Sequence, residues 1–190
     1  MADWNDFAAL LADNLARVEA ETRGRVPVDI ERAFALWAQW TVAVRSNGGT
    51  TYFAGNGASA SMACHFSADL AKNARVRTQV FTDPSLLTAI GNDLCYADVF
   101  AEPLRWYGRE SDLLITVSSS GNSPNVVRAL EVAREKGLRS VALCAMGPDN
   151  ASRDLADLCF FVPAATYGQA ETAHSAILHH WMDIMESLPR

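Results

Sequence analysis

Apolar residues recur at intervals of three and four through the first quarter of the chain, which is the spacing of an amphipathic helix. The first run consists of Trp4, Phe7, Leu11, Leu15 and Val18. Asp3 precedes this run as a candidate N-cap. After a break at Gly24 and Pro27, a second run consists of Ile30, Phe34, Trp37 and Val44. We therefore expect two helices within residues 1–49, whose aromatic faces pack against another subunit or against the chain's own sheet.

From Thr50 onward, short apolar runs alternate with stretches of helical periodicity. The expected strands cover residues 51–54, 77–81, 112–117, 140–144 and 158–162. The expected helices cover residues 59–72, 97–107, 124–136 and 170–188. Strands that are apolar on both faces and separated by helices are typical of a parallel sheet covered on both sides. The sequence predicts an α/β fold, a three-layer α/β/α sandwich with a five-stranded parallel sheet. We expect one domain, 1–190, in which 50–190 form the sandwich with its C-terminal helix.

Composition excludes several classes of function. The chain has 190 residues, of which 49% are hydrophobic and 20% are charged, so it can bury a core. Its net charge is −6 and it has no basic block, which argues against a nucleic-acid partner and against a polybasic membrane anchor. The acidic N-terminus lacks the apolar region of a signal peptide, and no stretch has the length of a membrane span. We expect a cytoplasmic protein that does not bind membranes and whose partner is a small molecule.

The clearest candidate for chemistry is the segment 117–126, ValSerSerSerGlyAsnSerProAsnVal, which joins a predicted strand to a predicted helix. Its four hydroxyl side chains belong to Ser118, Ser119, Ser120 and Ser123. Gly121 lets the backbone approach a ligand closely, and backbone amides at a helix N-terminus bind anions. One serine would be an ordinary helix cap, but four favour a site for a phosphate monoester. Because the segment has no lysine, it differs from the GxxxxGK[ST] loop of nucleotide-binding proteins.

Two more segments are candidates because ligands of an open parallel sheet bind at the carboxyl ends of its strands. Residues 55–61, GlyAsnGlyAlaSerAlaSer, place Asn56 and Ser59 ahead of a predicted helix. This glycine-rich loop is a weak signal alone, because the GxGxxG of dinucleotide-binding proteins is incomplete. Residues 90–98 place Asp93 shortly after a glycine, where an ordinary turn or helix cap is the simpler interpretation.

Ionisable side chains on two predicted helices form a further candidate group. His65 and Asp69 are four residues apart and share a helix face. Glu171 and His179 are eight residues apart, a little over two turns, on one side of the last helix. If the two pairs converge, two imidazoles and two carboxylates would suit either a tetrahedral zinc site or an acid/base pair. Taken alone, His65 is more simply a surface or supporting partner of Asp69.

Together the motifs resemble the sugar isomerase (SIS) domain family and, within it, the phosphoheptose isomerases. The resemblance covers nearly the whole chain. It rests on GlyAsnGlyAlaSer at 55–59, HisPhe at 65–66, GlyAsnAsp at 91–93, SerSerSerGlyAsnSer at 118–123 and the helix with His174 and His179. The serine segment marks the superfamily, and the histidine helix with GlyAsnAsp narrows it to the phosphoheptose isomerases. The resemblance implies the SIS fold and a homotetramer.

The resemblance also implies a reaction, the conversion of sedoheptulose 7-phosphate to D-glycero-D-manno-heptose 7-phosphate through an enediolate. Substrate contacts would come from Asn56, Ser59, Asp93, Ser118, Ser119, Ser120, Ser123 and Glu171. Asp69 would act as the base and His179 as the acid or proton shuttle. In members that bind zinc, the ligands would be His65, Asp69, Glu171 and His179.

Two positions depart from the family pattern, which usually has Glu at position 69 and Gln at position 171. Asp69 is one methylene shorter than Glu, and a misplacement of about 1 Å can cost ~100-fold in rate. Glu171 adds a negative charge, which should strengthen a divalent metal site or, without metal, raise the pKa of a neighbouring group. Either the two changes compensate, with Glu171 sharing the base role, or the substrate is a different ketose phosphate.

Two functions without turnover compete with the isomerase. Some proteins of very similar architecture bind a replication initiator as tetrameric scaffolds, and they lack the carboxylate and histidine that this chain has at Asp69 and His179. A sensor that binds a sugar phosphate would keep the serine segment and tolerate Asp69. Saturable binding of a sugar phosphate without turnover would support the sensor.

Overall fold

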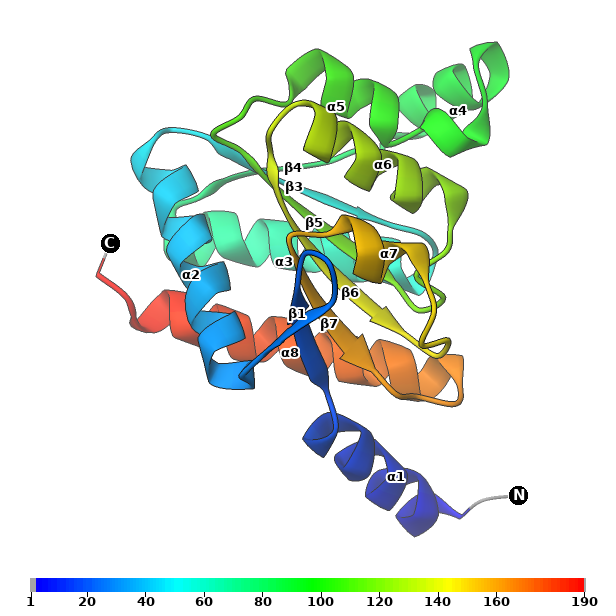
Figure 1. Cartoon of the computed structure of the whole chain (residues 1–190). Helices are drawn as coiled ribbons and strands as arrows, with labels where there is room; N and C mark the ends of the chain where they lie inside the picture. Colours follow the sequence, from blue (N-terminus) through cyan, green and yellow to red (C-terminus); the bar gives the residue numbers. More distant parts are fainter. Residues whose placement is uncertain (1–2, 190) are drawn as a thin grey trace.

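Five parallel strands form the centre of the computed structural model, which describes residues 3–189 (Figure 1). They are β3 (Thr50–Gly55), β4 (Arg77–Val80), β5 (Leu113–Ser118), β6 (Arg139–Ala145) and β7 (Leu158–Val162). Each begins and ends within one residue of its predicted range. They lie in the order β7-β6-β5-β3-β4, and central β5 is buried at every position, as expected of a strand that is apolar on both faces.

The prediction of a purely parallel, five-stranded sheet is wrong, because the sheet in residues 3–189 has seven strands and is mixed. β1 (Glu19–Thr22) and β2 (Val26–Val28) form an antiparallel hairpin, and β1 also pairs antiparallel with β7. Both strands are short, and their sequences, GluAlaGluThr and ValProVal, lack a long apolar run. Pro27, which the sequence pattern treats as a break, lies opposite Glu21 in the edge strand β2, where a missing N–H is tolerated.

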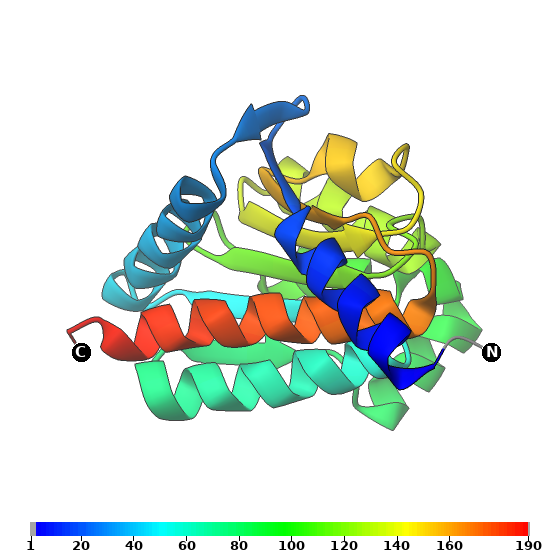
Figure 2. The same ribbon diagram turned by 90° about the horizontal axis from the view of Figure 1, so that it is seen from below.

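Helices cover both faces of the sheet, as the three-layer prediction requires. On one face lie α2 (Ile30–Ser46), α3 (Ala58–Ala74) and α8 (Tyr167–Ser187), with α1 (Trp4–Ala16) crossing α8 (Figure 2). On the other face lie α4 (Pro84–Asp93), the 3₁₀ turn η1 (Tyr96–Asp98), α5 (Ala101–Tyr107), α6 (Pro124–Glu135) and α7 (Ala151–Leu155). Across residues 3–189, every helix is too short or too polar to pass through a bilayer.

The two N-terminal helices bury their aromatic residues to very different extents. Trp37 of α2 is fully buried and stacks on Trp181 of α8 with ring centroids 4.3 Å apart. In α1, by contrast, Asn14 is the one buried residue, and the side chain of Trp4 is 76% exposed. Thus α2 packs against the chain's own sheet, whereas α1 keeps most of its aromatic surface exposed.

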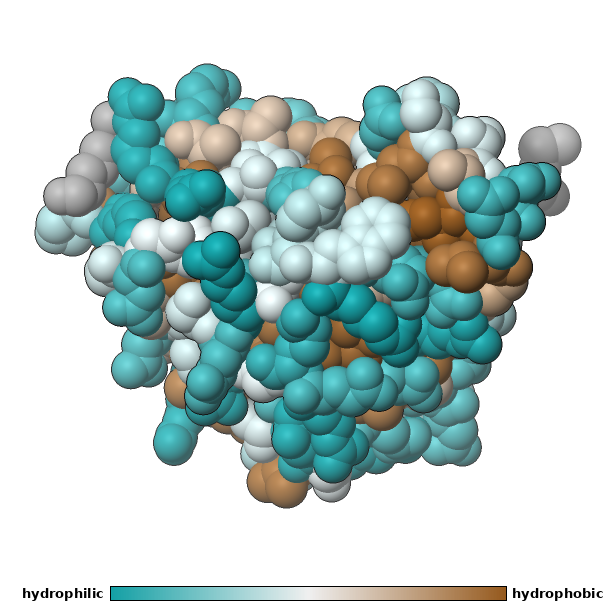
Figure 3. Space-filling view, turned by 90° about the horizontal axis from the view of Figure 1, so that it is seen from above, coloured by the Kyte–Doolittle hydropathy of each residue, from teal (hydrophilic) through white to brown (hydrophobic). Residues whose placement is uncertain are grey.

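The segment around GlyAsnAsp is helical rather than a loop, since residues 91–93 form the last turn of α4. The Asp83 side chain caps this helix by accepting a hydrogen bond from the Leu86 N–H at 3.0 Å, and Pro84 occupies its first turn. Figure 3 looks onto this side of the molecule, where a mainly hydrophilic surface is broken by apolar side chains near α4.

Candidate active site

A hollow of about 220 Å³ opens where β3 and β5 end at their carboxyl edge. Its lining consists of Asn56, Ser59, Val117, Ser118, Ser119, Ser120, Ser123, Tyr167 and Glu171. We call it the serine pocket. The fold therefore brings together two loops and the last helix, which are distant in sequence. Of the residues predicted to contact substrate, all but Asp93 lie here.

The serine loop is fixed by backbone contacts around one glycine. The Gly121 N–H donates to the Ser118 carbonyl at 2.9 Å, and the Gly121 carbonyl accepts from the Ser152 hydroxyl at 2.8 Å. Gly121 has φ 64°, and a Cβ atom at this position would collide with the side chain of Asn150. Glycine is therefore required at position 121, and the loop is anchored to α7.

Ser123 does not act as an ordinary helix cap. It occupies the N-cap position of α6, but its side chain makes no capping hydrogen bond. Its hydroxyl instead accepts from the Ser118 hydroxyl at 3.3 Å, inside the pocket. No lysine or arginine lines the pocket among the described residues. A phosphate bound there would be held by hydroxyls, by backbone amides and by the positive end of the α6 dipole.

Asn56 is oriented by two residues that the sequence analysis did not single out. Its Nδ2 donates to Asn125 Oδ1 at 2.9 Å, and Asn125 Nδ2 donates back to Asn56 Oδ1 at 2.9 Å. The Tyr96 hydroxyl adds a hydrogen bond of 3.3 Å to Asn56 Oδ1. Because Asn125 is buried in α6, this exchange ties the loop after β3 to the helix that follows the serine loop.

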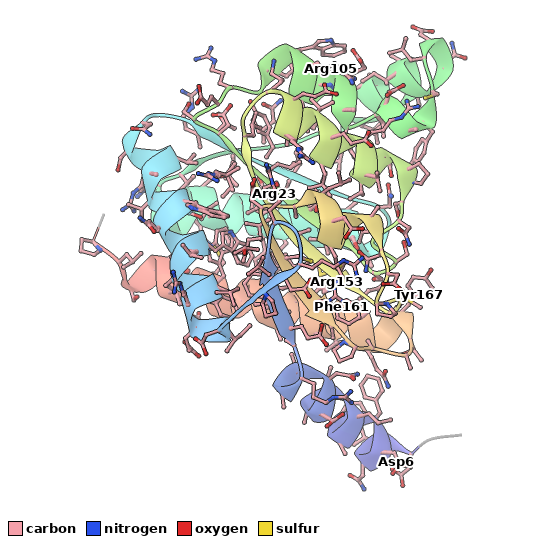
Figure 4. All side chains as sticks on the ribbon, viewed as in Figure 1. Asp6, Arg23, Arg105, Arg153, Phe161 and Tyr167 are labelled. Carbon is pink, nitrogen blue, oxygen red and sulfur yellow. The ribbon has the colours of Figure 1, made fainter. Side chains whose placement is uncertain are left out.

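The helix α8 contributes Tyr167 and Glu171, one turn apart, to the lining of the pocket. Tyr167 begins the helix near the carboxyl end of β7 (Figure 4). Thr166 caps this end by accepting a hydrogen bond from the Gln169 N–H. An ionised Glu171 would repel a phosphate dianion, so the carboxylate suits the uncharged part of a ligand whose phosphate lies at the serine loop.

His65, Asp69 and His179 form a second group on α3 and α8, which we call the imidazole cluster. His65 Nε2 lies 3.3 Å from Asp69 Oδ2, and the rings of His65 and His179 have centroids 5.9 Å apart. Phe66 contacts both rings, and Lys72 Nζ donates to Asp69 Oδ1 at 3.3 Å. None of the three cluster residues lines the serine pocket. Apart from Asp93, the predicted site residues therefore fall into two groups, each of which includes residues of α3 and α8.

Comparison with known proteins agrees with both the fold and the motifs. The model of the SIS domain family matches residues 14–145. The chain belongs to the SIS domain family. It is 35% identical over 194 residues to the phosphoheptose isomerase of Chlorobaculum parvum, covering 96% of this chain and 86% of that protein. It is 40% identical over 139 residues to that of Geobacter sp. strain M21, covering 70% and 71%. Within the SIS family it belongs with the phosphoheptose isomerases and is a sugar-phosphate isomerase.

Solved structures of SIS-family relatives show the same architecture. Phosphoheptose isomerase GmhA from Neisseria gonorrhoeae superposes with a TM-score of 0.78 at 27% identity, over 95% of this chain and 98% of that one. A phosphoheptose isomerase from Francisella tularensis superposes with a TM-score of 0.82 over 97% and 95%, and at 24% identity it supports the fold alone. The mixed sheet and its helical layers thus follow the architecture of these isomerases.

The SIS-family resemblance implies a zinc site, and its four predicted ligands are divided between the serine pocket and the imidazole cluster. Within residues 3–189, no three His, Cys, Asp or Glu side chains come together as metal ligands. Of the four predicted ligands, Glu171 lines the serine pocket, whereas Asp69 is engaged by His65 and Lys72. Zinc at this site stays a prediction.

The two other histidines of α8 lie outside the imidazole cluster. His174 is fully buried, and neither of its ring nitrogens has a hydrogen-bond partner among the described residues. Burial lowers the pKa of His174 to about 4, so its ring is neutral at pH 7. His180 packs edge-on against Phe34 with centroids 4.6 Å apart, which gives it a packing contact with α2.

Asp93 is the predicted substrate contact that the fold leaves outside the serine pocket. It is the last residue of α4, and its Oδ1 accepts a hydrogen bond from Asn92 Nδ2 at 2.8 Å. Three further residues belong to the site and were not predicted, namely Tyr96, Asn125 and Tyr167. Asn125 stands inside the serine segment and could have been found as a polar residue facing the core in the first turn of α6. The two tyrosines carried no recognisable spacing signal.

Proposed function

We propose that this SIS-family isomerase converts sedoheptulose 7-phosphate to D-glycero-D-manno-heptose 7-phosphate. The observation that carries the proposal is the serine pocket, where four serine hydroxyls lie beside Asn56, Ser59 and Glu171. Such a lining suits a phosphate at one end and a hydroxylated carbon chain at the other. The names of the relatives at 35–40% identity support the heptose as substrate.

The phosphate on C7 would occupy the serine loop. Ser118 and Ser119 are only 5% and 6% exposed. Their hydroxyls would replace the water around the phosphate oxygens. The N-terminal amides of α6 add positive partial charge without a lysine. Asn56, Ser59 and Asp93 are proposed to contact the hydroxyls of the sugar chain, with the Asn56 amide already oriented by Asn125.

The reacting carbons C1 and C2 lie at the other end of the seven-carbon chain. Asp69 and His179 stand farther along α3 and α8 than the pocket residues Ser59 and Glu171. The sugar would therefore extend from the serine pocket along these two helices toward the imidazole cluster. This arrangement explains why the predicted phosphate ligands and the predicted acid and base form two separate groups.

In the proposed reaction, Asp69 removes a proton from C1 of the ketose, and the electron pair forms the C1–C2 double bond of a cis-enediolate. The same proton, or one from solvent, returns to C2. His179 shuttles a proton from the oxygen on C1 to the oxygen on C2, which leaves the aldehyde at C1. His65, in contact with Asp69, would orient the carboxylate.

We also propose that the enzyme is a homotetramer that acts on a small-molecule sugar phosphate. The apolar side chains on and beside α1 support association, because they leave an open groove. It is lined by Leu15, Val18, Ile30, Phe34, Ala176, Ile177 and His180. Light scattering of the purified chain would give the number of subunits.

The deciding experiment is turnover of sedoheptulose 7-phosphate by the purified full-length protein, followed by NMR detection of the aldose. We expect the product to accumulate, and we expect Ser119→Ala with Ser120→Ala to raise KM strongly. A parallel calorimetric titration with sedoheptulose 7-phosphate distinguishes two results that would contradict the proposal. Binding without turnover would favour a sensor, and turnover of another ketose phosphate would change the substrate but keep the reaction.

A further inference from the structure

A second polar hollow, of about 260 Å³, lies at the opposite edge of the sheet from the serine pocket. Its walls include Tyr52, Arg77, Gln79, Tyr107, Arg109 and Asp112, and we call it the arginine pocket. β3 and β5 begin at this hollow and end at the serine pocket. The two sites are thus separated by the length of the central strands, and the proposed isomerase reaction uses none of the residues here.

The arginine pocket is positively charged, although the whole chain carries a net charge of −6. Neither Arg77 nor Arg109 forms an ion pair among the described residues, and the guanidinium of Arg77 makes one long contact of 3.5 Å with a carbonyl. The nearby Asp112 does not neutralise them by direct pairing. Its two carboxylate oxygens accept from the Thr50 N–H at 2.7 Å and the Arg109 N–H at 2.8 Å.

Other donors in the pocket are also unused by the protein. Within residues 3–189, the Gln79 amide and the Tyr107 hydroxyl make no hydrogen bond to another residue. Tyr52 is 3% exposed, and burial together with the Asp112 charge raises the pKa of its phenol.

The pocket wall is also tightly built on one side. A Cβ atom on Gly49 would lie 2.7 Å from the Ser111 carbonyl oxygen and 3.0 Å from Asp112 Oδ1. The turn after α2 is therefore pressed directly against the start of β5, where Asp112 holds Thr50. The backbone N–H of Arg109 donates to Asp112, so the backbone from which the Arg109 side chain extends is held in place.

We propose that the arginine pocket binds a small phosphorylated metabolite, distinct from the substrate held by the serine pocket. Two guanidinium groups match the charge of a phosphate dianion and can each donate two hydrogen bonds to its oxygens. The Gln79 amide and the Tyr107 hydroxyl would contact hydroxyl groups on the remainder of the ligand. The exposed ring of Tyr107 offers an apolar face for a sugar or a base.

The test uses inorganic pyrophosphate as the probe in calorimetric titrations of the full-length protein. To isolate the arginine pocket, the titrations use a Ser119→Ala, Ser120→Ala background, in which the serine pocket is weakened. We expect one equivalent to bind per chain, and Arg77→Ala with Arg109→Ala to weaken this binding by about tenfold or more. A matched control, Arg32→Ala with Arg134→Ala, removes the same charge from exposed arginines elsewhere and should leave the affinity unchanged.

Three outcomes would overturn the proposal. The first is that pyrophosphate does not bind to the Ser119→Ala, Ser120→Ala protein. The second is that adding Arg77→Ala with Arg109→Ala leaves the affinity unchanged. The third is that the control substitutions Arg32→Ala with Arg134→Ala weaken binding as much as the pocket substitutions do. Arg77→Lys with Arg109→Lys guards against misfolding, because it retains the charge but loses the paired donors. For this lysine variant we expect an intermediate affinity for pyrophosphate and an unchanged unfolding midpoint. Complete loss of binding by the lysine variant, with normal unfolding, would also support the guanidinium contacts.

Discussion

Arg153 of α7 and Glu21 of β1 form a buried ion pair that attaches the N-terminal hairpin to the rest of the fold. Arg153 Nε donates to Glu21 Oε2 at 2.9 Å, and its Nη2 donates to Glu21 Oε1 at 2.5 Å. The guanidinium lies over the ring of Phe161 in β7, 4.2 Å from its centroid (Figure 4). Glu19 adds a third contact of 2.7 Å to Nη2 from the more exposed side. The pair therefore fixes the antiparallel strand that completes the mixed sheet.

Replacing Glu21 with Gln should destabilise the fold by about 2 kcal/mol, because the Arg153 guanidinium would lose its buried carboxylate partner and keep only the more exposed Glu19. Urea unfolding followed by circular dichroism measures the change. The matched control is Asp13→Asn, which breaks the exposed Arg17–Asp13 pair and should change stability by less than about 1 kcal/mol. Equal effects from the two variants would show that Glu21 contributes little beyond a surface contact.

Glu21 also shows why the hairpin escaped prediction. Sequence patterns identify β3, β5, β6 and β7 because both faces of these strands are buried and apolar. β1 is attached to the fold by the charged residue Glu21, whose partner Arg153 is 132 positions away in the sequence. No local sequence pattern indicates a pairing over that distance. α4 escaped for a different reason, since its glycine and asparagine indicate a turn, although Asp83-Pro84 is a strong signal for a helix start.

The candidate site was predictable where spacing and strand order suffice. The rule that carboxyl ends of parallel strands meet at one edge brings Asn56 and Ser59 to the four serines. The rule that residues four apart share a helix face places His65 beside Asp69. Which turn of α8 faces which group depends on how the helix crosses the sheet. Sequence alone could not separate Glu171, in the serine pocket, from His179, in the imidazole cluster.

Asn125→Ala should reduce both stability and substrate affinity, because Asn56 would lose the two hydrogen bonds that orient its amide. We expect a loss of about 1–3 kcal/mol in unfolding free energy for the unsatisfied polar groups. KM should rise more than kcat falls, since the reacting carbons are not contacted. Asn5→Ala, on the exposed face of α1, is the control. An unchanged KM in a variant with normal kcat would remove Asn56 from the binding site.

Gly121→Ala should disable phosphate binding more severely than the loss of any single serine hydroxyl. The positive φ of 64° and the collision with Asn150 would shift the whole loop. We expect KM to rise about 100-fold or more, against about tenfold for Ser120→Ala. Gly147→Ala has open space around its Cβ position and serves as the control. Inhibition by inorganic phosphate should weaken in parallel with KM if the loop holds the phosphate.

The buried His174 should make the fold sensitive to acid. Its folded-state pKa of about 4 lies below the ordinary value of 6.5, so the unfolded state binds the proton more readily. Its contribution to stability is complete above about pH 6.5 and is lost as the pH falls toward 4, by about 3 kcal/mol in total. Unfolding free energies of wild type and His174→Asn, measured between pH 7 and 4.5, should converge as the pH falls. A gap that stays constant across this pH range would contradict this assignment.

Asp69→Asn and Glu171→Gln should separate the two carboxylates of the site. If Asp69 is the base, the Asn variant loses about 100-fold or more in kcat, with KM little changed. Glu171→Gln removes from the serine pocket a charge that repels phosphate, so KM should fall or stay level. Exchange of the C1 proton with deuterated water reports the base directly, and Asp183→Asn, which replaces an exposed carboxylate on α8, controls for charge.

The reverse pattern, with exchange lost in the Glu171→Gln variant and kept in the Asp69→Asn variant, would assign the base to Glu171 in the serine pocket. Asp69 would then be a partner of His65 rather than a catalytic residue.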